Sequence, residues 1–314
     1  MIVKKTNMLS KDEIHQYCNL FHNVFGKRMT VTEFAKKYQN NVSGYSYHSF
    51  MLDDNKIVGS YTVIPHEYKF FDNNMIFGLS VDTMIKEEYR GSPFVFKKLA
   101  NNAYMELKKD AIPFVFGFPN DNVYLVRKKI LKWQDIGDLK YYVMPIRIGK
   151  LMERFKKFGI INNVYAHTIN LFSPNSMTIK NNLNFPVEKV VSNGFLNDKY
   201  DNSYIVRQVK KCHFVYKIYN EDNIVTAFII DVYPLNKNNI EYCAKNIYQN
   251  EKEIDIIVYV GNLDFKAINL IKVPKKYEPK SVHMSGKILI PDAIDKRVFD
   301  LKHWNVNLSN YDVR

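Results

Sequence analysis

The chain has 314 residues, 46% of them hydrophobic, and at about 100–200 residues per domain this length favours two domains with sizeable cores. No run of about 18 apolar residues and no apolar N-terminal segment is present, so we expect a cytoplasmic protein without a membrane partner. The formal net charge of +13 would attract anionic ligands, but the basic residues are scattered and match no nucleic-acid-binding motif, so nucleic acid is not an expected partner. The three widely spaced cysteines predict neither a disulfide framework nor a metal site.

The first predicted elements are two helices. Ser10 precedes apolar residues at helical spacing, and Glu13 follows at the spacing of a capping box. Gly26 is expected to end this helix, and Thr32 is expected to cap the second one.

A β-hairpin and a long strand follow. Residues 47–52 and 57–64 are strand-like and are separated by the polar turn 53–55, which is typical of a hairpin. Residues 75–85 predict a long strand that runs into the sequence Tyr89-Arg90-Gly91-Ser92.

A helix over residues 93–109 is predicted next, because Pro93 suits a first-turn position, and Phe94 is expected on its buried face. The elements predicted after it are a buried strand at 114–118, a helix at 120–131 and a strand at 140–146. Together these elements indicate a mixed α/β fold around one sheet.

The second half of the chain predicts a degenerate copy of this order. Its predicted elements are a hairpin at 212–219 and 224–233, a helix at 238–249, a strand at 254–260 and a closing strand pair at 287–290 and 304–308. We place the domain boundary at 148/149, giving domains 1–148 and 149–314. No Arg-Gly turn links a strand to a helix in the second half, so we expect no phosphate-bearing cofactor there.

The turn at Tyr89-Arg90-Gly91-Ser92 is the strongest chemical signal in the sequence. A turn between a strand and a helix presents backbone N–H groups and a helix N-terminus to an anion, and both favour phosphate. The P-loop pattern G-x-x-x-x-G-K-[ST] and the dinucleotide pattern G-x-G-x-x-G are absent. A different kind of phosphate cradle is therefore expected.

The segment IKEEYRGSPFVFKKL resembles the pyrophosphate-binding motif Q/R-x-x-G-x-G/A of the Gcn5-related N-acetyltransferase (GNAT) family. Arg90 and Gly91 match it, whereas Glu88 stands at the Gln/Arg position and Pro93 at the Gly/Ala position. The order of elements over residues 40–146 is also similar, although Lys132 replaces a Gly that is usual after the fourth helix.

The resemblance implies a GNAT-like α/β fold in two tandem domains, of which only the first keeps its cofactor site. It also implies acetyl-CoA or another acyl-CoA as cosubstrate, and no metal. The cofactor-binding residues that it implies are the backbone of Met84 and Ile85, the turn residues Arg90, Gly91 and Ser92, and also Phe94 and Asn120.

Acyl transfer to an amine requires a base for the amine proton and an acid for the thiolate. Asp82 is the first candidate for the base or for a substrate anchor, with a solvated strand carboxylate as the alternative, and Glu67 is a second carboxylate nearby. The acid of the family is often a Tyr in the fourth helix, where this chain has Lys128. Tyr124 is the candidate to replace it, with a core tyrosine as the alternative.

His48 and His66 have no partner spacing and are expected to be structural. These observations predict a CoA-dependent N-acyltransferase, an acetyltransferase in the first instance, acting on a small primary amine such as an amino sugar or a nucleotide-linked amino sugar. The alternatives are a peptidoglycan-type transferase that uses aminoacyl-tRNA and a non-catalytic binding protein on the same scaffold.

Overall fold

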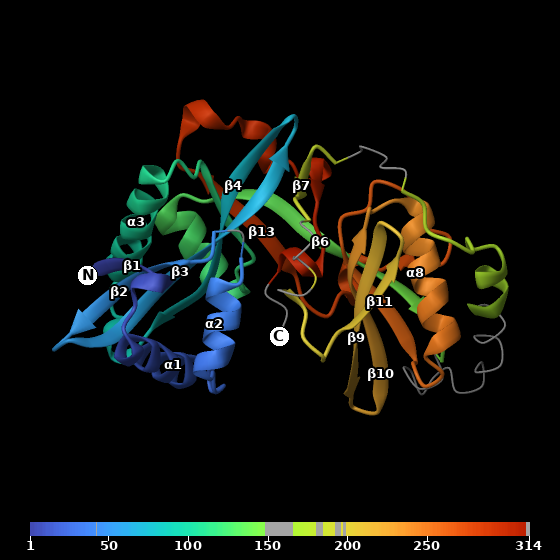
Figure 1. Ribbon diagram of the computed structural model, residues 1–314, viewed down its shortest axis with the longest axis horizontal. Coiled ribbons are helices and arrows are strands. Elements are labelled where there is room, and N and C mark those ends of the chain that lie inside the picture. Colours follow the sequence, from blue (N-terminus) through green and yellow to red (C-terminus); the bar gives the residue numbers. More distant parts are fainter. Residues whose placement is uncertain (42, 148–165, 180–184, 192–195, 197–198, 312–314) are drawn as a thin grey trace. The chain divides into compact units, whose positions relative to one another are not determined.

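The computed structural model describes the chain except for residues 42, 148–165, 180–184, 192–195, 197–198 and 312–314. The chain forms two compact units, which are shown in Figure 1. The first comprises Met1–Asp138, Val187–Lys199 and Val282–Leu301, and the second comprises Leu139–Pro186, Tyr200–Ser281 and Lys302–Arg314. The boundary predicted at 148/149 falls on residues outside the described part of the chain.

The sheet of the first unit has the strand order β1-β2-β3-β4-β5-β13. These strands are β1 (Ile2–Lys5), β2 (Tyr47–Asp53), β3 (Lys56–Phe70), β4 (Asn73–Ile85), β5 (Phe114–Gly117) and β13 (Val282–Ile288), and β7 (Val187–Lys189) pairs with β3. All of these neighbours are antiparallel except β4 and β5. The predicted hairpin is confirmed, and its turn residues Asp54 and Asn55 have φ values of 43° and 62°, as a two-residue hairpin turn requires.

The helices of the first unit are α1 (Lys11–Phe25), α2 (Val31–Gln39), α3 (Pro93–Lys109) and the short α4 (Asp121–Val126). The Ser10–Glu13 capping box and the left-handed Gly26 at the end of α1 are confirmed. The prediction that Thr32 caps α2 is wrong, because Thr30 forms a capping box with Glu33 and Thr32 lies inside the helix. A threonine two residues earlier places the carboxylate at the third helical position, which closes the box.

The two faces of the sheet bury different sets of side chains, because neighbouring strand residues point in opposite directions. On one face, the aromatic rings of α1 and α2 pack around His48, with Tyr17 and Tyr38 each about 5 Å from its ring. On the other face, Tyr47 and Tyr61 pack against α3. The sheet is therefore covered on both sides, and its functional surface lies at strand ends.

The second unit repeats a hairpin, a helix and a parallel strand, as the sequence predicts (Figure 1). Strands β9 (Cys212–Glu221) and β10 (Ile224–Tyr233) form the hairpin, α8 (Lys237–Asn250) follows, and β11 (Ile256–Gly261) runs parallel to β10. The outer neighbours are β8 (Ile205–Val209) beside β9, the part of β6 (Gln134–Pro145) that pairs with β11, and β12 (Ile271–Lys272).

The predicted closing pair of strands at 287–290 and 304–308 is wrong. Val282–Ile288 forms β13, which pairs with β5 in the first unit through Gly286↔Phe116 and Ser285↔Gly117. Gly286 permits this pairing because a Cβ there would lie 2.5 Å from the ring of Phe114. The described helices include none that is both long and apolar enough to cross a membrane.

Candidate functional site

The site begins where two parallel strands separate. β4 and β5 pair only over Phe77–Leu79 and Phe114–Phe116, whereas β4 continues to Ile85 along β3. We call the space beyond Leu79 and Phe116 the first fork. Among the described residues, no strand pairs with the β5-facing edge of β4 in the first fork, so its backbone is open to an extended ligand.

A bulge in β4 positions Asp82 beside this open edge. Ser60 pairs with Met84 and Thr62 with Val81, so two β4 residues face one residue of β3, and Asp82 has a φ of 41°. Such bulges re-aim side chains and are frequent beside functional sites.

The carboxylate of Asp82 is held by α2. Its side chain is only 6% exposed, Lys37 Nζ lies 2.6 Å from Oδ2, and the Tyr38 hydroxyl donates to the same oxygen at 2.5 Å. Burial, reinforced by the Asp82 charge, raises the pKa of Tyr38 well above its usual value, so Tyr38 keeps its proton and remains the donor. Asp82 is thus a fixed, ion-paired carboxylate and not a solvated one.

The basic turn joins β4 to α3. Its described backbone hydrogen bonds use the N–H groups of Lys86, Tyr89 and Arg90, and those of Gly91 and Ser92 take part in none. A Cβ at Gly91 would have no atom within 4 Å, so the space above the turn is open. Two unused N–H donors beside a helix N-terminus form a favourable place for phosphate.

The side chains of the turn are arranged differently from the prediction at one position. Arg90 Nε donates to the carbonyl of Ile85 at 2.8 Å, and the Ser92 hydroxyl caps α3 by accepting from Phe94 N–H. The prediction that Phe94 lies on the buried face of α3 is wrong, because its ring is 74% exposed and Phe96 is the buried ring of the first turns. The ring of Phe94 therefore flanks the turn from the solvent side.

The opposite side of the first fork is formed by α4. Asn120 follows β5 and caps this helix, with Oδ1 accepting from Val123 N–H at 3.1 Å, which leaves its amide nitrogen outside the described hydrogen bonds. The helix continues as a π-helical turn over Arg127–Leu131, which differs from the regular helix predicted at 120–131. Lys132, where the family motif has Gly, adopts a left-handed φ of 59°.

Tyr124 lies one turn after Asn120 and is not a core residue. Its hydroxyl donates to Asp135 Oδ1 at 2.8 Å and accepts from Lys128 Nζ at 3.4 Å. Burial and the Asp135 carboxylate raise its pKa, although Lys128 opposes them, so the phenol remains protonated at neutral pH.

The ring of Tyr124 stacks on His283 of β13 at a centroid distance of 4.3 Å. His283 Nδ1 lies 2.7 Å from Asp138, and Nε2 lies 3.2 Å from Asp121. The Asp121 side chain is 79% exposed, whereas that of His283 is only 18% exposed. An imidazole held by one carboxylate, with its other nitrogen toward an exposed carboxylate, has the geometry that proton transfer requires.

His283 was missed by the sequence reasoning because 145 residues separate it from Asp138. His48 and His66 were expected to be structural. Burial lowers the pKa of each to about 3, with Lys199 and Lys189 adding to the effect at His66, and the His48 ring contacts Thr6 and Thr62 in the core.

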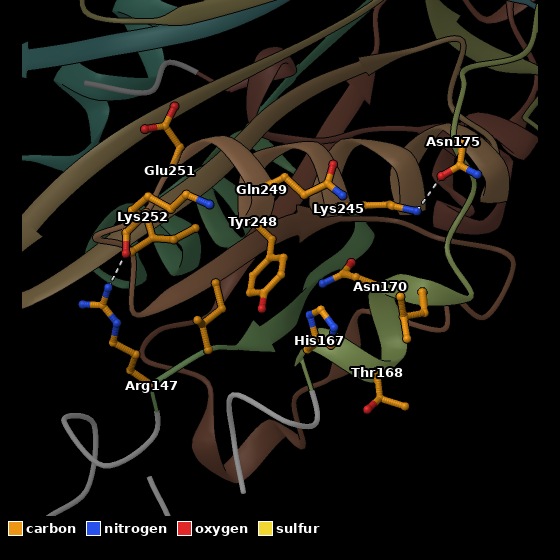
Figure 2. A pocket seen from close by; sticks show the side chains of 13 residues that line it. Arg147, His167, Thr168, Asn170, Asn175, Lys245, Tyr248, Gln249, Glu251 and Lys252 are labelled. Carbon is orange, nitrogen blue, oxygen red and sulfur yellow. Dashed lines mark hydrogen bonds between the residues drawn. The ribbon is translucent and has the colours of Figure 1, made fainter. Parts of the chain in front are cut away.

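The second unit contains a separate open pocket of about 1010 Å³, shown in Figure 2. Two of its cationic side chains are already bonded: Lys245 Nζ donates to Ser173 O at 2.9 Å and to Asn175 Oδ1 at 2.7 Å, and Arg147 donates to the carbonyl of Lys252. The described residues contain no group of three or more His, Cys, Asp or Glu side chains arranged to hold a metal ion. The chemistry-bearing side chains gather at the first fork instead.

Comparison with known proteins agrees with this geometry. Residues 5–128 match the family model described as an acetyltransferase (GNAT) domain. No curated protein matches the sequence.

Several solved structures have a similar fold and align with most of this chain. A GCN5-related N-acetyltransferase from Anabaena variabilis has a TM-score of 0.57 at 12% identity, covering 92% of this chain and 73% of its own. A probable N-acyltransferase from Enterococcus faecalis has a TM-score of 0.59 at 13% identity, with coverages of 92% and 72%. Eis1 from Mycobacterium abscessus has a TM-score of 0.58 at 8% identity, with coverages of 93% and 75%.

The matched residues 5–128 include the first fork, from β4 to α4. The similar structures share the fold over both units. Residues 5–128 are therefore similar to a GNAT acetyltransferase domain, and the fold over both units is similar to that of these solved structures.

Proposed function

We propose that the chain is a CoA-dependent N-acyltransferase whose acyl donor lies in the first fork. The observation that carries this proposal is the unpaired edge of β4 between Leu79 and Ile85, bounded by the Asp82 bulge and by the open turn at Gly91. An extended pantetheine arm can pair with such an edge as an added strand.

The residues around the first fork suit the parts of acyl-CoA. The free N–H groups of Gly91 and Ser92 and the dipole of α3 would receive the pyrophosphate, with Arg90 adding positive charge. The exposed Phe94 ring would contact the nucleotide, and the backbone of Met84 and Ile85 would pair with the arm. At the far end, the amide nitrogen of Asn120 would donate to the arm near the thioester.

The α4 side of the fork supports the transfer step. The amine nitrogen bonds to the thioester carbonyl carbon while the C–S bond breaks and its electron pair leaves with sulfur. His283, held by Asp138, would accept the amine proton, and Tyr124 would return a proton to the thiolate. Asp82, fixed between Lys37 and Tyr38, would anchor the acceptor instead of acting as the base.

The acceptor that we propose is a small primary amine, with amino sugars and nucleotide-linked amino sugars as the first compounds to test. An amine arrives as an ammonium ion, which the carboxylates near His283 favour, and it loses one proton to solvent before its nitrogen attacks the thioester. These carboxylates are Asp121, Asp135 and Asp138.

Isothermal titration with acetyl-CoA tests the donor site. The Arg90→Glu, Gly91→Asp double variant should bind acetyl-CoA at least about tenfold more weakly, because it places three units of negative charge change beside the pyrophosphate. The Lys275→Glu, Tyr277→Asp variant makes the same charge change on exposed residues of the second unit and should bind as the wild type does.

Equal binding by the wild type and the turn variant would contradict the proposal. Free-thiol release with a panel of amines then tests turnover. Acetyl-CoA binding without any thiol release would indicate a binding protein, and activity only with aminoacyl-tRNA would indicate the transferase that uses this donor.

A further inference from the structure

Arg127 is a buried cation without a counterion among the described residues. It is 4% exposed, and its Nη2 donates to the Ser80 hydroxyl at 3.0 Å and to the Thr83 hydroxyl at 3.5 Å. The guanidinium carbon lies 4.5 Å from the centre of the Trp133 ring. The Nε and Nη1 atoms have no hydrogen-bond partner in the described part of the chain.

These contacts do not neutralise the charge. Hydroxyl groups and an aromatic face stabilise a guanidinium, but only an anion compensates a full positive charge that has been removed from water. Arginine cannot escape the cost by losing its proton, because a guanidinium stays protonated in proteins. A cation left in this state therefore indicates a binding role in preference to a structural one.

Arg127 lies inside the first fork. A Cβ at Gly117, the last residue of β5, would lie 2.7 Å from Arg127 Nη1 and 2.8 Å from the carbonyl of Ser80. The guanidinium thus lies just beyond the last pair of β4 and β5, at Leu79 and Phe116. Its Nε and Nη1 donors are buried away from solvent beside the strand ends that form the fork.

The unmet requirement is for negative charge and not only for a hydrogen-bond acceptor. A thioester carbonyl is neutral, and the open backbone edge of β4 already offers it donors. A carboxylate neutralises the guanidinium, and its planar oxygens match the N–H geometry.

We propose that Arg127 binds a substrate carboxylate in the first fork, which deepens and rests on the proposed acyl transfer. The carboxylate is carried either by the acyl group of the donor, as in a dicarboxylic acyl-CoA, or by the acceptor amine. Arg127 is then the residue that selects an acidic substrate over a neutral one.

Titrations with succinyl-CoA and acetyl-CoA test the donor source. The wild type should bind succinyl-CoA about tenfold or more tightly than acetyl-CoA, and Arg127→Met should abolish this preference.

Thermal denaturation tests the other source, in which the amine carries the carboxylate. In that case the two thioesters bind equally. Succinate then stabilises the CoA-loaded wild type, and the neutral succinamide does not. Arg127→Met should lose that stabilisation. The proposal would be overturned if the wild type bound succinyl-CoA and acetyl-CoA equally and was also stabilised equally by succinate and succinamide.

A second readout does not depend on any CoA compound. Without added ligand, Arg127→Met should raise the melting temperature by a few degrees. Methionine occupies a volume similar to that of arginine and removes the uncompensated buried charge. Arg147→Met, which removes a partly exposed arginine paired with Asp255, should not raise it. A lower melting temperature for Arg127→Met would indicate a structural role and overturn the proposal. Failure of both thioesters to bind, with this rise present and succinate still discriminated, would contradict acyl transfer but not the anion site.

Discussion

The two units share a hairpin, a helix and a parallel strand, and they differ in what occupies the place where the parallel strands separate. In the second unit, β10 and β11 pair over Thr226–Ile229 and Ile256–Tyr259, and we call the space beyond these pairs the second fork. Gly261 bridges to Asn307 there, and Asn262 N–H donates to the carbonyl of Val306 at 2.9 Å. The chain itself thus fills the second fork, whereas a single side chain, Arg127, occupies the first.

The carboxylates beside the two forks also differ in their surroundings. Asp82 and Asp231 both lie at bulges of the equivalent strands. Asp82 is tied to α2, next to an open strand edge, whereas Asp231 is 1% exposed and accepts from Asn307 at 3.2 Å and from Tyr200 at 3.2 Å. The same arrangement of strands is thus compatible with an open strand edge in one unit and a closed polar core in the other.

The helices that follow the hairpins differ in the same way. α3 begins after a turn with two unused N–H groups, whereas α8 begins at the buried cap Asn236. Asn239 in the first turn of α8 exchanges hydrogen bonds with Thr178 at 2.7 and 2.9 Å. Chain atoms therefore cover the start of α8, where a phosphate would have to bind.

Adding one methyl group to each fork should give the largest difference between the units. Gly117→Ala places a Cβ against Arg127 and the Ser80 carbonyl, so we expect catalytic efficiency to fall by about 100-fold through displacement of the donor. Gly261→Ala places a Cβ 2.6 Å from the Val306 carbonyl and should cost stability while the folded protein still binds acetyl-CoA. Titration and steady-state kinetics measure both. A stoichiometry of two acetyl-CoA per chain would break the comparison.

Removing the stacked pair of the first unit should have the next largest effect. We expect His283→Gln and Tyr124→Phe each to lower kcat by about 10²-fold, with acetyl-CoA affinity unchanged, because each removes a proton-transfer group. His213→Gln and Tyr200→Phe alter the polar cluster around Asp231 in the second unit and should leave kcat unchanged. If kcat responded equally to both pairs, the catalytic roles of His283 and Tyr124 would be wrong.

The smallest expected difference between the units is in how the stability contributed by their helix caps depends on pH. Hydrogen bonds from the backbone and hydroxyl of Thr30 lower the pKa of Glu33, so its contribution to stability is complete above the unfolded value of about 4.3 and is lost as pH falls through the lower folded value. Urea unfolding should show a Glu33→Gln penalty of at most about 1 kcal/mol at pH 7 that disappears near pH 3. Asn236→Ala, at a cap without an ionisable group, should show the same penalty at both values. A pH-independent Glu33→Gln penalty would contradict this assignment.

Local patterns were sufficient for most elements. The capping box at Ser10, the hairpin turn at Asp54–Asn55, the helix starting at Pro93 and the second hairpin are all as predicted, because each depends on residues close in sequence. The errors at Thr32 and Phe94 are also local. Thr30 and Thr32 are both possible caps of α2, and Phe94 and Phe96 are both possible members of the buried face of α3. The sequence pattern alone did not distinguish between the two residues of each pair.

The sequence by itself determined the mixed α/β fold, the repeated order of elements and the basic turn, because short-range periodicity and turn chemistry specify them. Only the tertiary structure brought β13 to β5, His283 to Asp138 and Arg127 into the first fork, because these contacts join residues far apart in the chain. It also decided that Val306 and Asn307 close the second fork. Burial and strand pairing, which have no signature in a local pattern, therefore distinguish the open unit from the closed one.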